Sequence, residues 1–115
     1  HEFIMNEQRI YSKPRMFDGG PDRIMRPRNG LSPGLILPDI KTGKKEEWHK
    51  YQTAGYKILV EENYPSLKIV KRCSVYLSPN EYQIKWHTDK NDENIFLCAL
   101  NVCHEKRNDN IKEPL

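Results

Sequence analysis

Proline placement limits the folding of the first part of this chain more than any other feature. Each proline lacks an amide N–H and disfavours helix in the residue before it, so a stretch rich in proline cannot form a regular helix. Turn signals such as Gly19-Gly20 add to the irregular pattern. The sequence predicts an extended Pro/Gly-rich N-terminal arm over residues 1–30, with Leu35-Ile36-Leu37 as a short strand docked on the domain. The prolines between residues 4 and 45 are Pro14, Pro21, Pro27, Pro33 and Pro38.

One small α+β domain is expected over residues 31–115. The whole chain has 115 residues, of which 37% are hydrophobic and 30% charged, a composition typical of a globular domain with one modest core. No run reaches the roughly 18 apolar residues that a membrane-spanning helix needs. Cys73, Cys98 and Cys103 are odd in number, which argues against a disulfide framework and for a reducing compartment. With no apolar leader at its start, the chain is expected to be intracellular.

Hydrophobic spacing predicts the elements of this domain. Over residues 44–62, apolar side chains recur at helical spacing. Residues 66–78 and 81–88 alternate between apolar and polar side chains, which is typical of strands. Residues 94–103 are apolar on both sides, and this pattern fits either a buried strand or a short helix. The expected fold class is one helix packed on a small antiparallel β-sheet of about three strands, with the extended arm in front.

Excess positive charge lies in the arm. The formal net charge is +3, and the arm contains Arg15, Arg23, Arg26 and Arg28. Spaced arginines suit contacts to the phosphates of DNA or RNA, and they also pair with acidic groups on a partner protein. A solvated tail kept soluble by its charge is the simpler interpretation. These four arginines are the candidate residues for binding nucleic acid or an acidic partner.

A second pattern lies in the last two expected strands. Glu81-Tyr82-Gln83-Ile84-Lys85-Trp86 is followed, eight residues after the tryptophan, by Asn94, and ten after it by Phe96. The segment resembles the strand-loop-strand region of the chromodomain family, where an E-Y-x-hydrophobic-K-W strand leads to an N-T-W triplet at that spacing. Upstream, Glu61-Glu62-Asn63-Tyr64 is similar to the lead-in of that family. The resemblance covers residues 61–102.

This resemblance implies a recognition module that binds a histone-like peptide in the nucleus. In chromodomains, aromatic side chains surround a methylated ammonium group through cation–π attraction. Carried onto this sequence, the ligand-binding residues would be Tyr64, Trp86 and Phe96, with Phe96 at the position of the triplet's tryptophan. A structural interpretation stays open, in which Tyr82, Ile84 and Trp86 form the core face of an antiparallel hairpin.

Cysteine and histidine near the end of the chain offer an alternative from another class. Cys98 and Cys103-His104, with His87 upstream, are ligand types that suit tetrahedral zinc, and they faintly resemble the end of an HNH nuclease motif. The spacing is wider than the usual C-x2-C pair. Small buried hydrophobic residues explain the cysteines better. We therefore expect folding without metal and no cofactor.

The patterns together favour a binding module over an enzyme. No group of residues stands out as an acid–base or nucleophilic centre, and no phosphate-cradling glycine loop is present. The preferred function is a non-enzymatic recognition module associated with chromatin or nucleic acid. Two alternatives stay open: a zinc-dependent or HNH-like nucleic-acid enzyme, and a structural protein–protein interaction domain whose arm docks on a partner.

Overall fold

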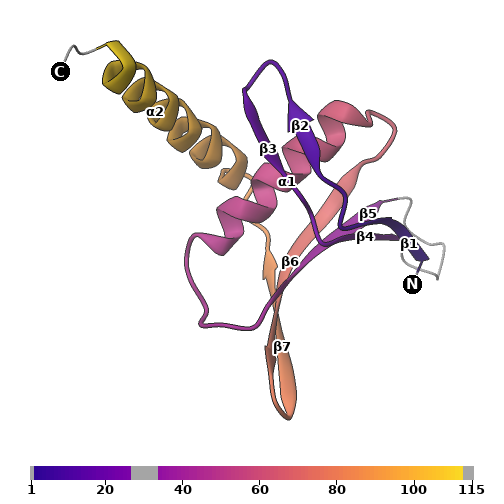
Figure 1. Ribbon diagram of the computed structural model, residues 1–115. Coiled ribbons are helices and arrows are strands. Elements are labelled where there is room, and N and C mark those ends of the chain that lie inside the picture. Colours follow the sequence, from indigo (N-terminus) through magenta and orange to yellow (C-terminus); the bar gives the residue numbers. More distant parts are fainter. Residues whose placement is uncertain (1, 27–33, 113–115) are drawn as a thin grey trace.

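A mixed sheet forms the centre of the molecule. The structure is a computed structural model that describes residues 2–26 and 34–112. In spatial order, the five strands are β1 (Glu2–Asn6), β4 (Arg23–Arg26), β5 (Leu35–Lys41), β6 (Ile69–Ser78) and β7 (Glu81–His87). A smaller sheet pairs β2 (Ile10–Ser12) with β3 (Phe17–Gly19). The helices of the described residues are α1 (His49–Asn63) and α2 (Asp92–Lys112), as Figure 1 shows.

The connection from β5 through α1 to β6 sets the topology. β5 and β6 pair in parallel, whereas β1–β4, β4–β5 and β6–β7 pair antiparallel. Parallel neighbours need a long crossover, and α1 supplies it. The hydrophobic core lies between α1 and the sheet, where Leu59 and Val60 of α1 cluster with Leu35 and Leu37 of β5. α1 thereby places its polar side chains along the end of β5.

The expected α+β class is confirmed, but the expected architecture is wrong. The sheet has five strands and is mixed, and a second helix is present. The expected arm folds as well, because it forms β1 to β4 and buries Met5, Ile10 and Ile24. Proline prevents helix but not extended backbone. The expected boundary between residues 30 and 31 lies outside the described residues.

Pro38 shows how proline fits inside this sheet. It lies within β5 and pairs with Cys73 of β6. In the part of the chain that the structure describes, the ladder between β4 and β5 is limited to Met25 and Ile36. Pro38 therefore lies beyond the paired part of that edge, where no N–H is required of it. Because the proline is tolerated here, β5 continues to Lys41, past the expected segment Leu35-Ile36-Leu37.

Residues 94–103, for which strand and helix were both open, lie in α2. The side chains of Phe96, Leu97, Leu100 and His104 are partly buried and recur at helical spacing, whereas most of their neighbours along the helix are exposed. α2 therefore packs through one narrow stripe, and it contacts α1 with its first half (Figure 1). Neither helix of the described residues is long and apolar enough to span a membrane.

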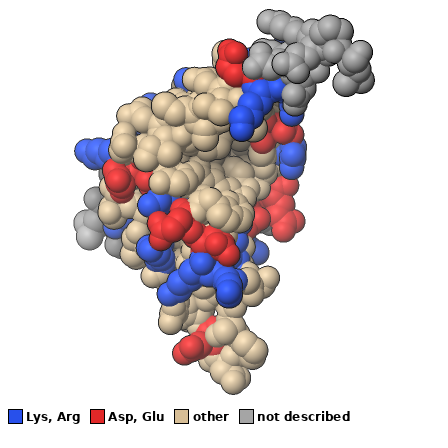
Figure 2. All heavy atoms as spheres, turned by 90° about the vertical axis from the view of Figure 1, so that its left-hand side faces the viewer, with Lys and Arg blue, Asp and Glu red and all other residues tan. Residues whose placement is uncertain are grey.

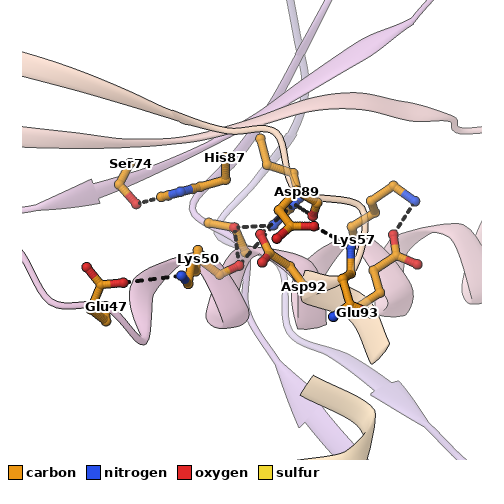
Figure 3. Close-up of polar contacts among 11 residues, drawn as sticks. Glu47, Lys50, Lys57, Ser74, His87, Asp89, Asp92 and Glu93 are labelled. Atoms are coloured by element: carbon orange, nitrogen blue, oxygen red, sulfur yellow. Dashed lines mark hydrogen bonds and ion pairs between the residues drawn. The ribbon is translucent and has the colours of Figure 1, made fainter. Parts of the chain in front are cut away.

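A buried ion pair fixes the start of α2 to the sheet. Arg72 Nη2 lies 2.9 Å from Asp92 Oδ2, and both side chains are almost fully buried. The same guanidinium donates hydrogen bonds to the carbonyl oxygens of Lys50 and Asp89 and to Thr53 Oγ1. Arg72 thus joins β6, α1 and α2 in one contact network, and Figure 3 shows Asp92 and Asp89 within it.

Removing Asp92 should destabilise the protein strongly, because it leaves the Arg72 guanidinium buried without its counter-charge. We expect Asp92→Ala to lower the free energy of unfolding by about 3–5 kcal/mol. The matched control is Glu93→Ala, which removes the more exposed ion pair with Lys57 and should cost less than about 1 kcal/mol. Urea titration followed by circular dichroism measures both, and equal losses would contradict the role given to Arg72.

Candidate active site

Two carboxyl groups meet where β4 begins and β5 ends. β4 runs antiparallel to β5, so Asp22, the residue before β4, lies beside the carboxyl end of β5. The backbone N–H of Ile40 donates a hydrogen bond of 3.1 Å to Asp22 Oδ2. The carboxyl of Asp39 lies within hydrogen-bonding reach of Asp22 and is 3% exposed. The contact between β4 and β5 therefore brings together two acids, Asp22 and Asp39, that are far apart in sequence.

A chain of polar side chains leads from Asp39 to α1. Asp39 and Lys41 alternate along β5 and so share one face of the sheet. Lys41 Nζ lies 3.0 Å from Asp39 Oδ2 and donates a hydrogen bond of 2.7 Å to Gln52 Oε1. Gln52 Nε2 in turn donates to the hydroxyl of Tyr56, one turn further along α1, over 2.8 Å. α1 therefore fixes the position of the Lys41 ammonium group.

The Asp39 carboxyl is electrostatically unusual. Burial raises its pKa to about 6, the charge of Lys41 acts against that rise, and the neighbouring Asp22 adds to it. Oδ2 is also buried, and its contact with the Lys41 ammonium at 3.0 Å is an ion pair without the geometry of a regular hydrogen bond. Buried polar atoms in native proteins are almost always satisfied, and the exceptions concentrate at functional sites. The Asp39 carboxyl is therefore suited to bind a cation or to take up a proton.

A small cavity lies beside Gln52 and Tyr56, at the α1 end of this polar chain. It has a volume of about 300 Å³ and lies between the β2–β3 hairpin and the helices, with Arg9, Gly19, Gln52 and Tyr56 in its lining. Burial raises the pKa of the Tyr56 hydroxyl, and the charge of Asp39 raises it further, which places this ring close to the acids. A Cβ at Gly19 would lie 2.9 Å from Tyr56 Cε1, so only glycine lets the hairpin approach α1 this closely.

The arrangement fits a magnesium ion better than zinc. Among the described residues, no group of three or more His, Cys, Asp or Glu side chains could hold a metal ion. Zinc sites in proteins usually need three or four such ligands. Mg²⁺ is commonly bound by one or two carboxylates together with water and substrate phosphate. Asp22 and Asp39 provide that smaller set, and the Lys41 ammonium, 3.0 Å from Asp39 Oδ2, already lies where a cation meets this carboxyl.

The three residues expected to form an aromatic cage lie on separate elements. Tyr64 follows α1, packs against the core cluster and accepts a hydrogen bond from Gln8. Trp86 is on β7, 46% exposed, with Lys71 Nζ 5.7 Å from its ring centroid. Phe96 is on α2 and contacts the ring of Phe17, with centroids 5.2 Å apart. Binding of a methylated ligand by these residues stays a prediction.

The expected arginine set is spread over several elements. Arg15 forms an ion pair with Glu62 at the end of α1. Arg23 and Arg26 lie at the two ends of β4, and Arg28 lies outside the described residues. The face of the molecule in Figure 2 carries acidic and basic side chains next to one another. Their role in binding nucleic acid or an acidic partner also stays a prediction.

Sequence reasoning missed Asp22, Asp39 and Lys41. The available signal was the alternation along residues 35–41, which puts Asp39 on the same face as the core residues Leu35 and Leu37. A carboxylate on a buried face is rare without a functional or structural partner. The pairing with Asp22 could not be read from the sequence, because it depends on the β4–β5 contact. Cys98 and Cys103 are exposed and free, whereas Cys73 is buried.

Comparison with solved structures finds the same fold elsewhere. The crystal structure of a protein named SSO0001 matches with a TM-score of 0.52 and 22% sequence identity, over 84% of this chain and 47% of that one. A crystal structure described as a "putative exonuclease" from Eubacterium rectale matches with a TM-score of 0.53 and 10% identity, over 89% of this chain and 43% of that one. This chain therefore spans less than half the length of either protein. No family model and no curated protein matches the sequence.

Removing the Asp39 carboxylate should stabilise the fold at alkaline pH. The folded-state pKa of about 6 lies above the ordinary aspartate pKa of about 4, so the fold loses stability as the pH rises between these two values, and the loss is complete above pH 6. Asp39→Asn should raise the free energy of unfolding at pH 8 by about 1–3 kcal/mol, and the gain should vanish below pH 4.

The measurement is urea unfolding of both proteins across that pH range. Asp18→Asn is the matched control, because its exposed carboxylate pairs only with Arg9 at the surface. That control should change stability by less than about 1 kcal/mol at any pH. A destabilised Asp39→Asn protein at pH 8 would show that the Lys41 contact outweighs the burial of the carboxylate.

Proposed function

We propose that this chain is a Mg²⁺-dependent nuclease whose active centre consists of Asp22, Asp39 and Lys41. The observation that carries the proposal is the buried Asp39 carboxyl, whose pKa is raised, beside a second carboxyl and an ammonium group. Two acids and a lysine at a strand end form a set suited to phosphate chemistry. The nucleic-acid enzyme that the sequence left open thereby becomes the preferred function, but without zinc and without Cys98, Cys103 or His104.

Each residue has a distinct role in the proposed reaction. Asp22 and Asp39 would hold the cation, which when bound supplies Lewis-acid activation of the phosphate and neutralises its charge. Phosphodiester hydrolysis joins a water oxygen to phosphorus and releases the sugar oxygen, so negative charge grows on the phosphoryl oxygens. The Lys41 ammonium can donate a hydrogen bond to one of those oxygens. Gln52 holds Lys41 in place through the 2.7 Å hydrogen bond to its Nζ.

The surroundings of the acids are consistent with an anionic substrate. Arg9 lines the cavity beside Gln52 and Tyr56, where it pairs with Asp18 and keeps its side chain 72% exposed, so the guanidinium is also within reach of a phosphate. The formal net charge of +3 also favours attraction of a polyanion. The name of the similar Eubacterium rectale protein, a "putative exonuclease", points to the same substrate class. The preferred function from sequence, a recognition module that binds without cleaving, is the competing proposal.

Cleavage assays separate the two proposals. The wild-type protein, incubated with single- and double-stranded DNA and RNA, should cleave at least one of them with Mg²⁺ or Mn²⁺ and none with excess chelator. Lys41→Met should lower kcat by about 100-fold or more, because it removes a donor to the charge that develops in the transition state. Asp22→Asn and Asp39→Asn should abolish both cleavage and metal binding, the latter measured by calorimetry.

Glu105→Gln is the matched control for these carboxyl changes, since this residue lies on the exposed side of α2. It should cleave and bind metal as the wild type does. Binding of nucleic acid by the wild type without cleavage under any of these conditions would refute the nuclease and favour the recognition module. Cleavage that survives Asp39→Asn would refute the assignment of the site.

A further inference from the structure

β7 is an edge strand whose apolar side chains lie in the open. In the sheet formed by the described residues, β7 pairs with β6 on one side and has no strand on the other. Tyr82, Ile84 and Trp86 are 66%, 47% and 46% exposed, and Leu77 of β6 is 44% exposed. The β6–β7 hairpin projects beyond the rest of the sheet in Figure 1, and its end carries few charged side chains in Figure 2. Such an edge is a template for pairing with another strand.

The exposed residues share one face of the hairpin. Tyr82 lies opposite Leu77, Ile84 opposite Val75 and Trp86 opposite Cys73. Directly opposed residues of antiparallel strands project to the same face. This is the face away from α1, because Arg72 and Tyr76, on the other face of β6, bond to Lys50 and His49 of α1. His87 of β7 lies on that other face too, with its Nε2 2.8 Å from Ser74 Oγ (Figure 3). An apolar stripe therefore runs along an open sheet edge.

Proteins usually protect such an edge with charged side chains, above all lysine, with proline or with a bulge. Within β7 there is no proline, and its pairing with β6 is regular from Glu81 to His87. Its charged residues, Glu81 and Lys85, lie on the face opposite the apolar stripe. The apolar face of β7 therefore carries none of these devices, and its charges are confined to the other face.

We propose that β7 pairs antiparallel with β7 of a second copy of this chain, across a two-fold axis at Ile84. This register sets Tyr82 opposite the partner's Trp86, and Trp86 opposite the partner's Tyr82, so two aromatic pairs flank the central Ile84 side chains. On the other face, Glu81 lies diagonally across from the partner's Lys85. The strand is therefore complementary to itself in both apolar contacts and charge.

The backbone selects the same register. The turn Pro79-Asn80 is closed by Ser78 and Glu81, so backbone groups of alternate residues from Glu81 onward point toward β6. Those of Tyr82, Ile84 and Trp86 then point outward and are available to the partner. An axis at Lys85 would bring two ammonium groups face to face, and like charges in that position are destabilising. An axis at Gln83 would leave Trp86 unpaired.

The dimer would join two sheets into one and is independent of the proposed nuclease function. Asp39 lies on β5, which is separated from β7 by β6, so each copy keeps its own complete set of acids. The interface is of the isologous kind that closes after two subunits, because both edges are used. Loss of the dimer would leave cleavage intact, and loss of cleavage by Asp39→Asn would leave the dimer intact.

Sedimentation analysis tests the dimer directly. The wild type should sediment as a dimer in the micromolar range, and Ile84→Lys as a monomer with unchanged circular dichroism, because it places two ammonium groups at the axis. Val102→Lys is the matched control: it changes an equally exposed apolar residue on α2 and should stay dimeric. A monomeric wild type, or a dimeric Ile84→Lys protein, would overturn the proposal.

Crosslinking tests the register and does not depend on how Ile84→Lys folds. Directly opposed strand residues have Cα atoms about 5.5 Å apart, within the range of a disulfide. In a protein with Cys98→Ser and Cys103→Ser, which removes the exposed thiols, Ile84→Cys should form a covalent dimer on mild oxidation. Val102→Cys in the same background should not. Equal crosslinking of the two, or none at residue 84, would refute the proposed axis.

Discussion

The Arg72 guanidinium holds both helices in position, because it bonds to α1 and forms an ion pair with Asp92 at the start of α2. It bonds the carbonyl oxygen of Lys50 and the hydroxyl of Thr53, and so holds one turn of α1 against β6. Gln52 lies on that same turn and accepts the hydrogen bond from Lys41. Arg72 on β6 thereby helps to fix the position of the Lys41 ammonium group on the neighbouring strand β5. The geometry of the candidate active site therefore depends on the ion-pair network of Arg72 and Asp92, although these two residues take no part in the proposed chemistry.

The local elements could be predicted from the sequence better than their assembly. Alternation from residue 66 to 88 indicated β6 and β7, and the apolar spacing before Asn63 indicated α1, because these patterns reflect burial against a single neighbour. The first 26 residues were misjudged, since frequent proline was read as an irregular arm. Their strands form through contacts with distant partners, and Ile24 is buried in one cluster with residues of α1 and β5 such as Leu59 and Leu37.

The candidate site was missed for the same reason. Asp39 lies beyond the expected short strand Leu35-Ile36-Leu37, and its carboxyl comes to the buried face because β5 continues to Lys41. Its partner Asp22 belongs to the stretch that was expected to be extended and unpacked. A single sequence shows neither the antiparallel contact of β4 with β5 nor the hydrogen bond from Ile40 to Asp22. Two acids that are unremarkable separately become a candidate site only when the sheet joins them.

The short β4–β5 ladder has a consequence for the local stability of this molecule. Among the described residues, the β4–β5 pairing is limited to Met25 and Ile36, so few backbone hydrogen bonds of this part of the chain hold β1 and β4 to the rest of the sheet. Apolar packing by Met5 and Ile24 has to supply most of the remaining attachment. Segments held in this way open sub-globally at a lower free energy than the whole fold, and their amide hydrogens exchange first. Each such opening would carry Asp22 away from Asp39, so the paired acids would come apart and reassemble many times while the β5–β6 core stays closed.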